Sequence, residues 1–153
     1  MTNDHSTSDA QSLGDAGPGE EARERWAREM ALPAQRRAAR LARRATRAQL
    51  AFWRVPQLEE TAVLLVSELV TNSVRHAHTQ GDELLLRLEI TWSSLRIEVY
   101  DDDPRWPRPG TPPEFSESGF GFVLVAALAS NWGVSDTATG KSVWAELDIL
   151  QRP

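Results

Sequence analysis

The sequence contains no cysteine, no long apolar run, and a single lysine among its 17 cationic residues. The absence of cysteine excludes disulfides, thiolate metal sites and cysteine nucleophiles. No stretch approaches the roughly 20 apolar residues that a membrane-spanning helix needs. The first residues, MTNDHSTSDAQSLGDAGPGEEA, lack the apolar core of a secretory signal. We therefore expect a cytoplasmic protein without membrane contact.

Charge is distributed unevenly along the chain, although the net charge is only −5. Residues 1–22 contain five acids and no Lys or Arg, residues 23–54 contain ten Arg and two Glu, and residues 55–153 contain fifteen acids and seven cationic residues. A basic segment can indicate nucleic-acid binding. No zinc-finger spacing, aromatic-rich RNA motif or helix-turn-helix pair accompanies it, and its arginines also fit a solvated helix face or a partner's docking surface. We therefore expect no direct contact with nucleic acid.

The length of 153 residues is enough for one domain with a buried core. A hydrophobic content of 41% and a charged content of 25% are ordinary for a globular protein. Residues 1–22 are rich in Ser, Gly and Asp and offer little to bury. This composition predicts a disordered acidic tail over 1–22, followed by a single domain over 23–153.

Hydrophobic periodicity predicts the secondary structure of that domain. In chain order we expect a strand near 25–31, helices over 34–52 and 58–78, strands over 83–92 and 94–101, a helix over 120–130, and a hairpin of 134–137 with 141–150. Residues 102–118 contain five prolines and fit neither a helix nor a central strand. The order predicts an α+β fold, a two-layer sandwich with three helices on one face of a mixed, mostly antiparallel sheet.

Prolines delimit the first expected helix. Pro33 fits a first helical turn, where its missing N–H costs little, and Val55–Pro56 breaks the helix. Its apolar stripe is predicted to be Ala34, Ala38, Leu41, Ala45, Ala48 and Phe52. Elsewhere, one core between the helices and the sheet is expected to hold Leu65, Leu69, Val99, Leu124 and Leu128.

The second helix carries an unusual row of polar residues. Glu68, Asn72 and His76 recur at i, i+4 and i+8 and so lie along one side of the helix. The row borders an apolar stripe of Ala62, Leu65, Val66, Leu69, Ser73 and Ala77. Such a row is either the polar boundary of an amphipathic helix or a set of side chains facing a cleft. For His76 a structural role is favoured, and a zinc pair with His78 is rejected because the two point apart on a helix.

The stretch SELVTNSVRHA resembles the first motif of the Bergerat-type ATPase domain shared by gyrase and histidine kinases. It is most similar to the small anti-sigma factor/serine-protein kinase branch common in actinobacteria, where the motif reads S-E-L-V-T-N-A-V-R-H-A. Only Ser73 differs from that pattern. The order of the later pieces, IEVYD, ESGFGFVLV and GKSVWAEL, also follows the family. The resemblance covers about residues 24–150 and implies the Bergerat ATP-binding fold.

The resemblance implies roles for the two matched polar residues of this helix. Asn72 corresponds to the asparagine that coordinates Mg²⁺, and its neutral amide oxygen is a hard ligand suited to that ion. Glu68 corresponds to the glutamate that takes the proton from an attacking water or serine hydroxyl, or positions it. Their spacing of four residues puts both groups on one side of the helix, where they can act on one γ-phosphate.

The resemblance implies nucleotide contacts for five further residues. Asp101 corresponds to the aspartate that accepts a hydrogen bond from the adenine amino group. Gly119 and Gly121 resemble the second glycine box, at the start of a helix whose free N–H groups would face phosphates. Gly140 and Ser142 resemble the last box, in which a hydroxyl supports the adenine aspartate.

The family's Asp-x-Gly-x-Gly box is altered in this sequence. Residues 101–105 read Asp-Asp-Asp-Pro-Arg, so Asp103 and Arg105 stand where glycines belong. Glycine serves there because the backbone passes close to the base. Two hypotheses stay open. The chain is an ATP- and Mg²⁺-binding regulator of the anti-sigma type that phosphorylates a serine or threonine of its antagonist, or it is a catalytically degenerate module that only sequesters a partner. A histidine-kinase fragment fits less well, because no phosphoacceptor helix pair is present.

By resemblance, the protein partners would be a sigma factor and an anti-anti-sigma antagonist. The family often dimerises, so a homodimer is a further expectation. Either the arginine-rich helix or an edge of the sheet could supply the surface for it.

Overall fold

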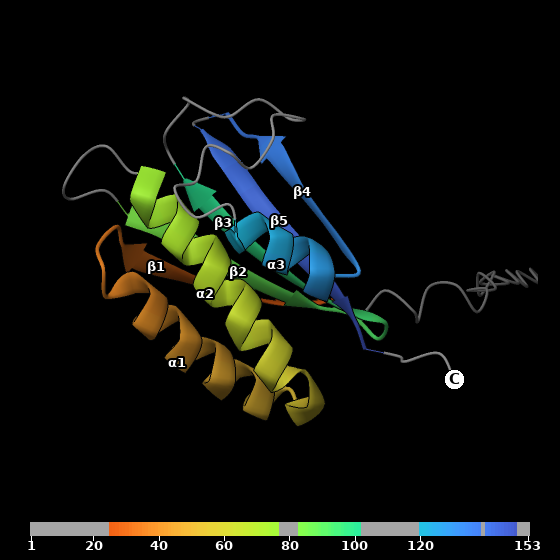
Figure 1. Ribbon diagram of the computed structural model, residues 1–153. Helices are drawn as coiled ribbons and strands as arrows, with labels where there is room; N and C mark the ends of the chain where they lie inside the picture. Colours follow the sequence, from red (N-terminus) through yellow and green to blue (C-terminus); the bar gives the residue numbers. More distant parts are fainter. Residues whose placement is uncertain (1–24, 77–82, 102–119, 139, 150–153) are drawn as a thin grey trace, which may run out of the picture.

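The computed structural model describes residues 25–76, 83–101, 120–138 and 140–149. Within them a five-stranded sheet carries three α-helices on one face (Figure 1). The elements in chain order are β1 (Trp26–Pro33), α1 (Ala38–Phe52), a short 3-10 turn (Pro56–Leu58), α2 (Glu59–His76), β2 (Glu83–Ile90), β3 (Ser94–Asp101), α3 (Phe120–Leu128), β4 (Asn131–Asp136) and β5 (Lys141–Asp148). This arrangement confirms the predicted α+β sandwich.

The strand order is β1-β2-β3-β5-β4, and every pair of neighbouring strands is antiparallel. The expected parallel component is therefore absent from the described strands. Both predicted hairpins, β2–β3 and β4–β5, are present. In the central β3–β5 pair, Asp101 at the end of β3 lies opposite Lys141 at the start of β5.

The hydrophobic core lies between the helices and the sheet. Of the residues predicted for it, Leu65, Leu69 and Val99 are fully buried. Leu128 is partly buried against the core, and Leu124 is half-buried. Helix α3 contributes its fully buried side chain through Val125 instead. The core is thus built mainly by α2 and the middle strands, with α3 packed at one side.

Helix α1 differs from its prediction in both its start and its buried side. It begins at Ala38, and Pro33 is the last residue of β1, an edge strand where a missing N–H is tolerated. Its buried residues are Ala38, Ala42, Thr46 and Leu50, whereas Phe52 is 79% exposed. Thr46 can be buried because its hydroxyl donates to the Ala42 carbonyl at 2.8 Å.

The end of α1 agrees with the prediction. The helix stops at Phe52, and Arg54 adopts a left-handed φ of 59°, which ends the helix before Val55 and Pro56. Three other expectations lie outside the described residues: the tail 1–22, the last residues of the second helix (77–78), and the proline-rich segment 102–118. Within the described ranges no helix is long and apolar enough to cross a membrane.

Candidate functional site

A buried ion pair closes one end of the sheet. The Asp101 carboxylate and the Lys141 ammonium face each other across β3 and β5, with Oδ2 and Nζ 3.8 Å apart. Both residues are buried, at 6% and 3% exposure. Burying two charges is unfavourable unless they compensate each other and find further polar contacts. At this end of the helix-covered sheet face, the chain therefore buries two charged side chains.

Asn72 is a second buried polar residue, on the later half of α2. It is 6% exposed, and its Nδ2 atom has no hydrogen-bond partner among the described residues. A buried donor without a partner costs about 1–3 kcal/mol, so it requires a physical reason. The neighbouring Ser73 is satisfied, because its hydroxyl donates to the Leu69 carbonyl at 3.0 Å. The unsatisfied amide of Asn72 is therefore suited to receive a polar ligand.

Glu68 lies one turn before Asn72 and is half-buried. The predicted polar row thus runs along the border of the buried stripe, since Leu65, Leu69 and Ser73 beside it are all buried. His76 is the last residue of α2, and its side chain is not among those described, nor are Ala77 and His78. The structural role expected for His76 stays a prediction.

The last turns of α2, the end of β3 and the first turn of α3 lie at the same end of the molecule (Figure 1). Gly121 belongs to that first turn of α3, whereas Gly119 lies outside the described residues. Free N–H groups at a helix start attract anions. Parts of three separate segments of the sequence therefore lie toward one end of the molecule.

In the last glycine box, Ser142 differs from the expectation, whereas the nucleotide contact expected of Gly140 stays a prediction. Gly140 closes the β4–β5 turn, where its N–H bonds the Thr137 hydroxyl at 3.0 Å. Ser142 faces the opposite side of the sheet and donates to Glu98 Oε1 at 2.7 Å. Its hydroxyl therefore does not support Asp101, because successive side chains of a strand point to opposite faces. The residue that faces Asp101 is Lys141, which sequence reasoning missed; its being the only lysine in the chain was the available signal.

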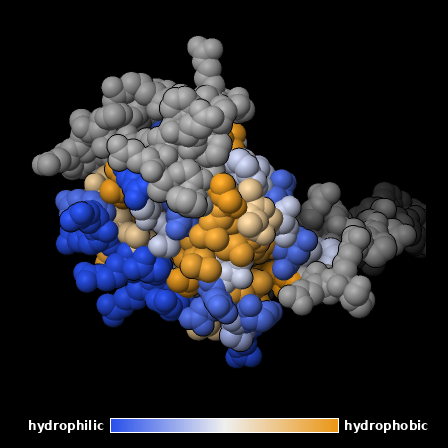
Figure 2. Space-filling view, in the orientation of Figure 1, coloured by the Kyte–Doolittle hydropathy of each residue, from blue (hydrophilic) through white to orange (hydrophobic). Residues whose placement is uncertain are grey.

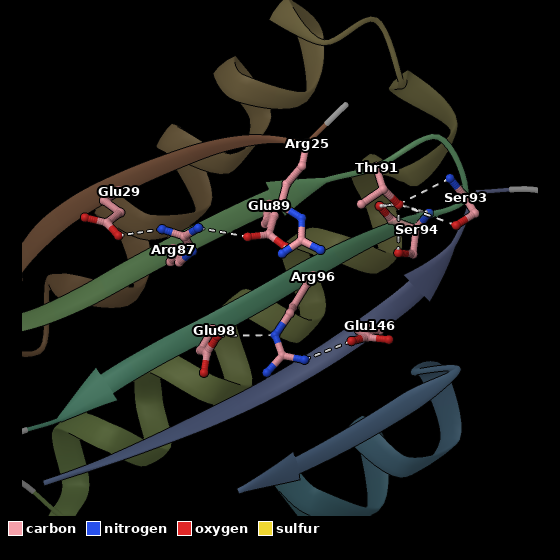
Figure 3. A network of polar contacts seen from close by, with 10 residues as sticks. All are labelled: Arg25, Glu29, Arg87, Glu89, Thr91, Ser93, Ser94, Arg96, Glu98 and Glu146. Atoms are coloured by element: carbon pink, nitrogen blue, oxygen red, sulfur yellow. Dashed lines mark hydrogen bonds and ion pairs between the residues drawn. The ribbon is translucent and has the colours of Figure 1, made fainter. Parts of the chain in front are cut away.

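The outer face of the sheet, away from the helices, carries chains of charged side chains (Figure 3). Arg87 bonds Glu29 at 2.7 Å and Glu89 at 2.8 Å, and Arg25 lies 3.5 Å from Glu89. Hydrogen bonds from Arg87 to Glu89 and then Glu29 raise the pKa of its guanidinium. Each of these side chains therefore has an opposite charge beside it.

A second chain on this face is centred on Arg96. Burial lowers the pKa of Arg96, but hydrogen bonds to Glu98 and Glu146, at 3.2 and 2.9 Å, outweigh it and leave the pKa raised. The guanidinium also stacks on Trp144, 4.2 Å from the ring centroid. Trp144 in turn covers Gly133, where an added Cβ would come within 2.7 Å of the ring. This face is stabilised by contacts within the chain.

The fold is that of an ATPase domain of the Bergerat type. Over residues 32–147 the sequence matches the histidine kinase-like ATPase domain, and the chain belongs to that family. The resemblance seen in the sequence is thereby confirmed. None of the curated proteins compared with the chain is significantly similar to it.

The structure of the RsbU and RsbW domains of Rv1364c from Mycobacterium tuberculosis is among the solved structures that are similar in fold. The TM-score is 0.60 and the sequence identity 20%. The match covers 79% of this chain but 31% of that one, so this chain spans about a third of the protein it resembles. At this identity the likeness concerns the fold.

Proposed function

We propose that this protein binds ATP with Mg²⁺ and acts in the cytoplasm as a regulator of the anti-sigma type, phosphorylating a serine or threonine of its antagonist. The observation that carries the proposal is Asn72, a buried amide one helical turn from Glu68 whose Nδ2 has no hydrogen-bond partner among the described residues. Membership of the histidine kinase-like ATPase family supports nucleotide binding. The residues present fit the ligand, because an amide offers an oxygen to a hard cation and a donor to a phosphate oxygen.

Each side chain has a distinct task in this proposal. Asp101 accepts a hydrogen bond from the adenine amino group, and Lys141 offsets the charge of that carboxylate. Asn72 holds the metal ion, which supplies neutralisation of the phosphate charge when bound. Glu68 accepts the proton of the attacking hydroxyl. Its half-buried position leaves the carboxylate within reach of a substrate from solvent.

Protein partners follow from the same proposal. A sigma factor and an anti-anti-sigma antagonist are the expected pair, the latter being the phosphate acceptor. The RsbW domain named for the structural neighbour supports this assignment, since RsbW-like domains share the fold. Ser142, on the far side of the sheet, is no longer proposed as a contact to the nucleotide.

A homodimer is also part of the proposal, and a groove beside the edge strand β1 favours it. The groove has a volume of about 1050 Å³ and lies between β1 and the second half of α1, with Trp26, Met30, Phe52, Trp53 and Leu88 among its lining residues. Trp26 is 58% exposed. Within the described strands β1 pairs on one side only. A second copy would cover exposed aromatic rings and extend the sheet.

Sedimentation velocity tests the dimer. The wild type is expected at the dimer mass, and Trp26→Asp with Phe52→Asp is expected at the monomer mass. Trp92→Asp is the matched control, because Trp92 is equally exposed, at 62%, but lies outside the groove. A monomeric wild type, or a dimer indifferent to the groove variants, would remove this part of the proposal.

Transfer of radiolabelled phosphate from ATP to candidate antagonist proteins tests the kinase activity. Glu68→Gln is expected to lower transfer by on the order of 10²–10⁴ while ATP affinity changes little, since a positioned base acts in the transition state. Asn72→Ala is expected to weaken ATP binding and transfer together. Wild-type transfer that survives Glu68→Gln would contradict the role of Glu68. Partner binding without any wild-type transfer would favour the sequestering module over the kinase.

A further inference from the structure

Helix α1 presents a row of arginines to solvent. Arg37, Arg40, Arg44 and Arg47 recur at i, i+3, i+7 and i+10, which places them along one side of the helix. All four are exposed. We call this set the arginine stripe. Figure 2, in the orientation of Figure 1, shows a strongly hydrophilic band over the position of α1.

The arginine stripe does not stabilise helix α1. No acidic residue occupies the first turn of α1, and Arg37, the N-cap residue, and Arg40 lie near the positive end of the helix dipole. Like charges three and four residues apart also repel each other along the helix. The arrangement therefore weakens α1 slightly, and its reason must lie outside the helix.

Among the described residues, one of the four stripe arginines has an acidic partner. Arg47 lies 3.5 Å from Glu59, and the adjacent Arg43 donates to the Ser67 hydroxyl. For Arg37, Arg40 and Arg44 no ion pair exists with any described residue. The arginines of the outer sheet face differ, because each has a glutamate at its side (Figure 3). Three of the four stripe arginines thus present a positive charge that no described residue compensates, on an acidic protein.

The spacing of the four arginines indicates which kind of ligand would fit the arginine stripe. Carboxylates at i, i+3, i+7 and i+10 on a helix lying along α1 would each meet one guanidinium, and Arg–carboxylate contacts are often bidentate. A nucleic acid fits less well, because a long polyanion extends beyond the stripe toward residues 55–153, which hold fifteen acids against seven cationic residues and repel it, whereas a single helix faces the stripe alone. We propose that the arginine stripe is the docking surface for a helix of a protein partner that carries Asp or Glu at this spacing. The proposal is independent of nucleotide binding.

The experiment measures fluorescence anisotropy of a labelled synthetic peptide with the full chain. The matched peptide is an alanine-based helix of about 15 residues, the length of α1, with Glu at the four stripe positions. A permuted peptide of the same composition distributes the four Glu around the helix. We expect the matched peptide to bind about ten-fold more tightly than the permuted one, and binding to weaken as salt rises.

Variants of the protein test whether the matched peptide binds at the arginine stripe. The double variant Arg40→Gln with Arg44→Gln is expected to bind the matched peptide about ten-fold more weakly. The thermal midpoint of the protein is expected to stay as high as in the wild type. Arg25→Gln, the same neutralisation on the outer sheet face, is the control and is expected to leave binding unchanged. Equal binding of the two peptides, or no loss in the double variant, would overturn the proposal.

Two further outcomes would replace the proposed occupant. Tighter binding of a duplex or single-stranded oligonucleotide than of the matched peptide, at the same salt, would make the stripe a nucleic-acid surface. In a further variant the five acids of residues 1–22 are neutralised. If this variant binds the matched peptide about ten-fold more tightly, as the loss of a few competing ion pairs would cause, the stripe is occupied by the chain's own N-terminal segment.

Discussion

The two faces of the sheet treat polar groups in opposite ways. On the outer face, charged side chains form chains of ion pairs at 2.7–3.5 Å, and the Ser142 hydroxyl donates a hydrogen bond to Glu98. On the helix-covered face, Asp101 meets Lys141 at 3.8 Å at one end of the sheet, and the buried Nδ2 of Asn72 has no hydrogen-bond partner among the described residues. Polarity alone therefore does not locate a site. The informative group is a buried polar atom that has no partner among the described residues.

The largest expected effect lies in the core beneath the candidate site. Leu69 is fully buried, so Leu69→Ala should lower the free energy of unfolding by about 2–5 kcal/mol. Leu64, on the same helix but 43% exposed, is the control, and Leu64→Ala should cost less than about 1 kcal/mol. Urea melts measure both. Equal losses would mean that α2 does not pack on the sheet in this register.

Asn72 offers a test in which stability and binding move in opposite directions. Asn72→Leu removes the unsatisfied donor and supplies an apolar side chain of similar shape, so unfolding should cost about 1–3 kcal/mol more. The same change should abolish Mg²⁺-dependent ATP binding, a cost in function that often accompanies such stabilisation. Denaturant melts and calorimetry of one preparation give both numbers. A destabilised variant would show that Asn72 is satisfied within the chain.

Ser142 provides the counterpart on the outer face. Ser142→Ala removes the hydroxyl that donates a hydrogen bond to Glu98 at 2.7 Å, and Glu98 is buried. The free energy of unfolding should fall by about 1–2 kcal/mol. Affinity for ATP should stay within two-fold of wild type, roughly the scatter expected for a residue outside the site. An ATP affinity that falls with Ser142→Ala would return this residue to the nucleotide site.

The smallest expected change in stability is at Arg25. Its ion pair with Glu89 spans 3.5 Å, and the Arg25 side chain is 66% exposed. Arg25→Gln should change the free energy of unfolding by less than about 0.5 kcal/mol, because exposed pairs contribute little. The thermal midpoint at low and high salt measures this. A loss comparable with that of Ser142→Ala would mean that the outer ion pairs act as one cooperative network.

Much of the fold follows from periodicity in the sequence. The alternation in ELLLRLEI and SLRIEVYD predicts β2 and β3 because one face of each strand is buried. The register of α1 could not be predicted in the same way. Alanines occupy several sides of that helix, so its pattern does not single out one buried side, and packing selected the side with Thr46 and Leu50.

Prediction of the site reached its limits at the last strand. The motif order pointed to Gly140 and Ser142, but order does not state which face a side chain occupies. That depends on pairing between β3 and β5, which are 44 residues apart at the Ser142–Glu98 bond. The ion pair of Lys141 with Asp101 arises from the same long-range register. The row of Glu68 and Asn72 was accessible from sequence because it depends on one helix alone.

Calorimetric titration of the full chain with ATP, in the presence and absence of Mg²⁺, tests the central claim most directly. We predict Mg²⁺-dependent binding that Asp101→Asn weakens by more than about ten-fold, because the amide presents a donor to the adenine amino group. Binding that is absent with Mg²⁺, or is equally tight in wild type and Asp101→Asn, would contradict the assignment of this end of the sheet as a nucleotide site.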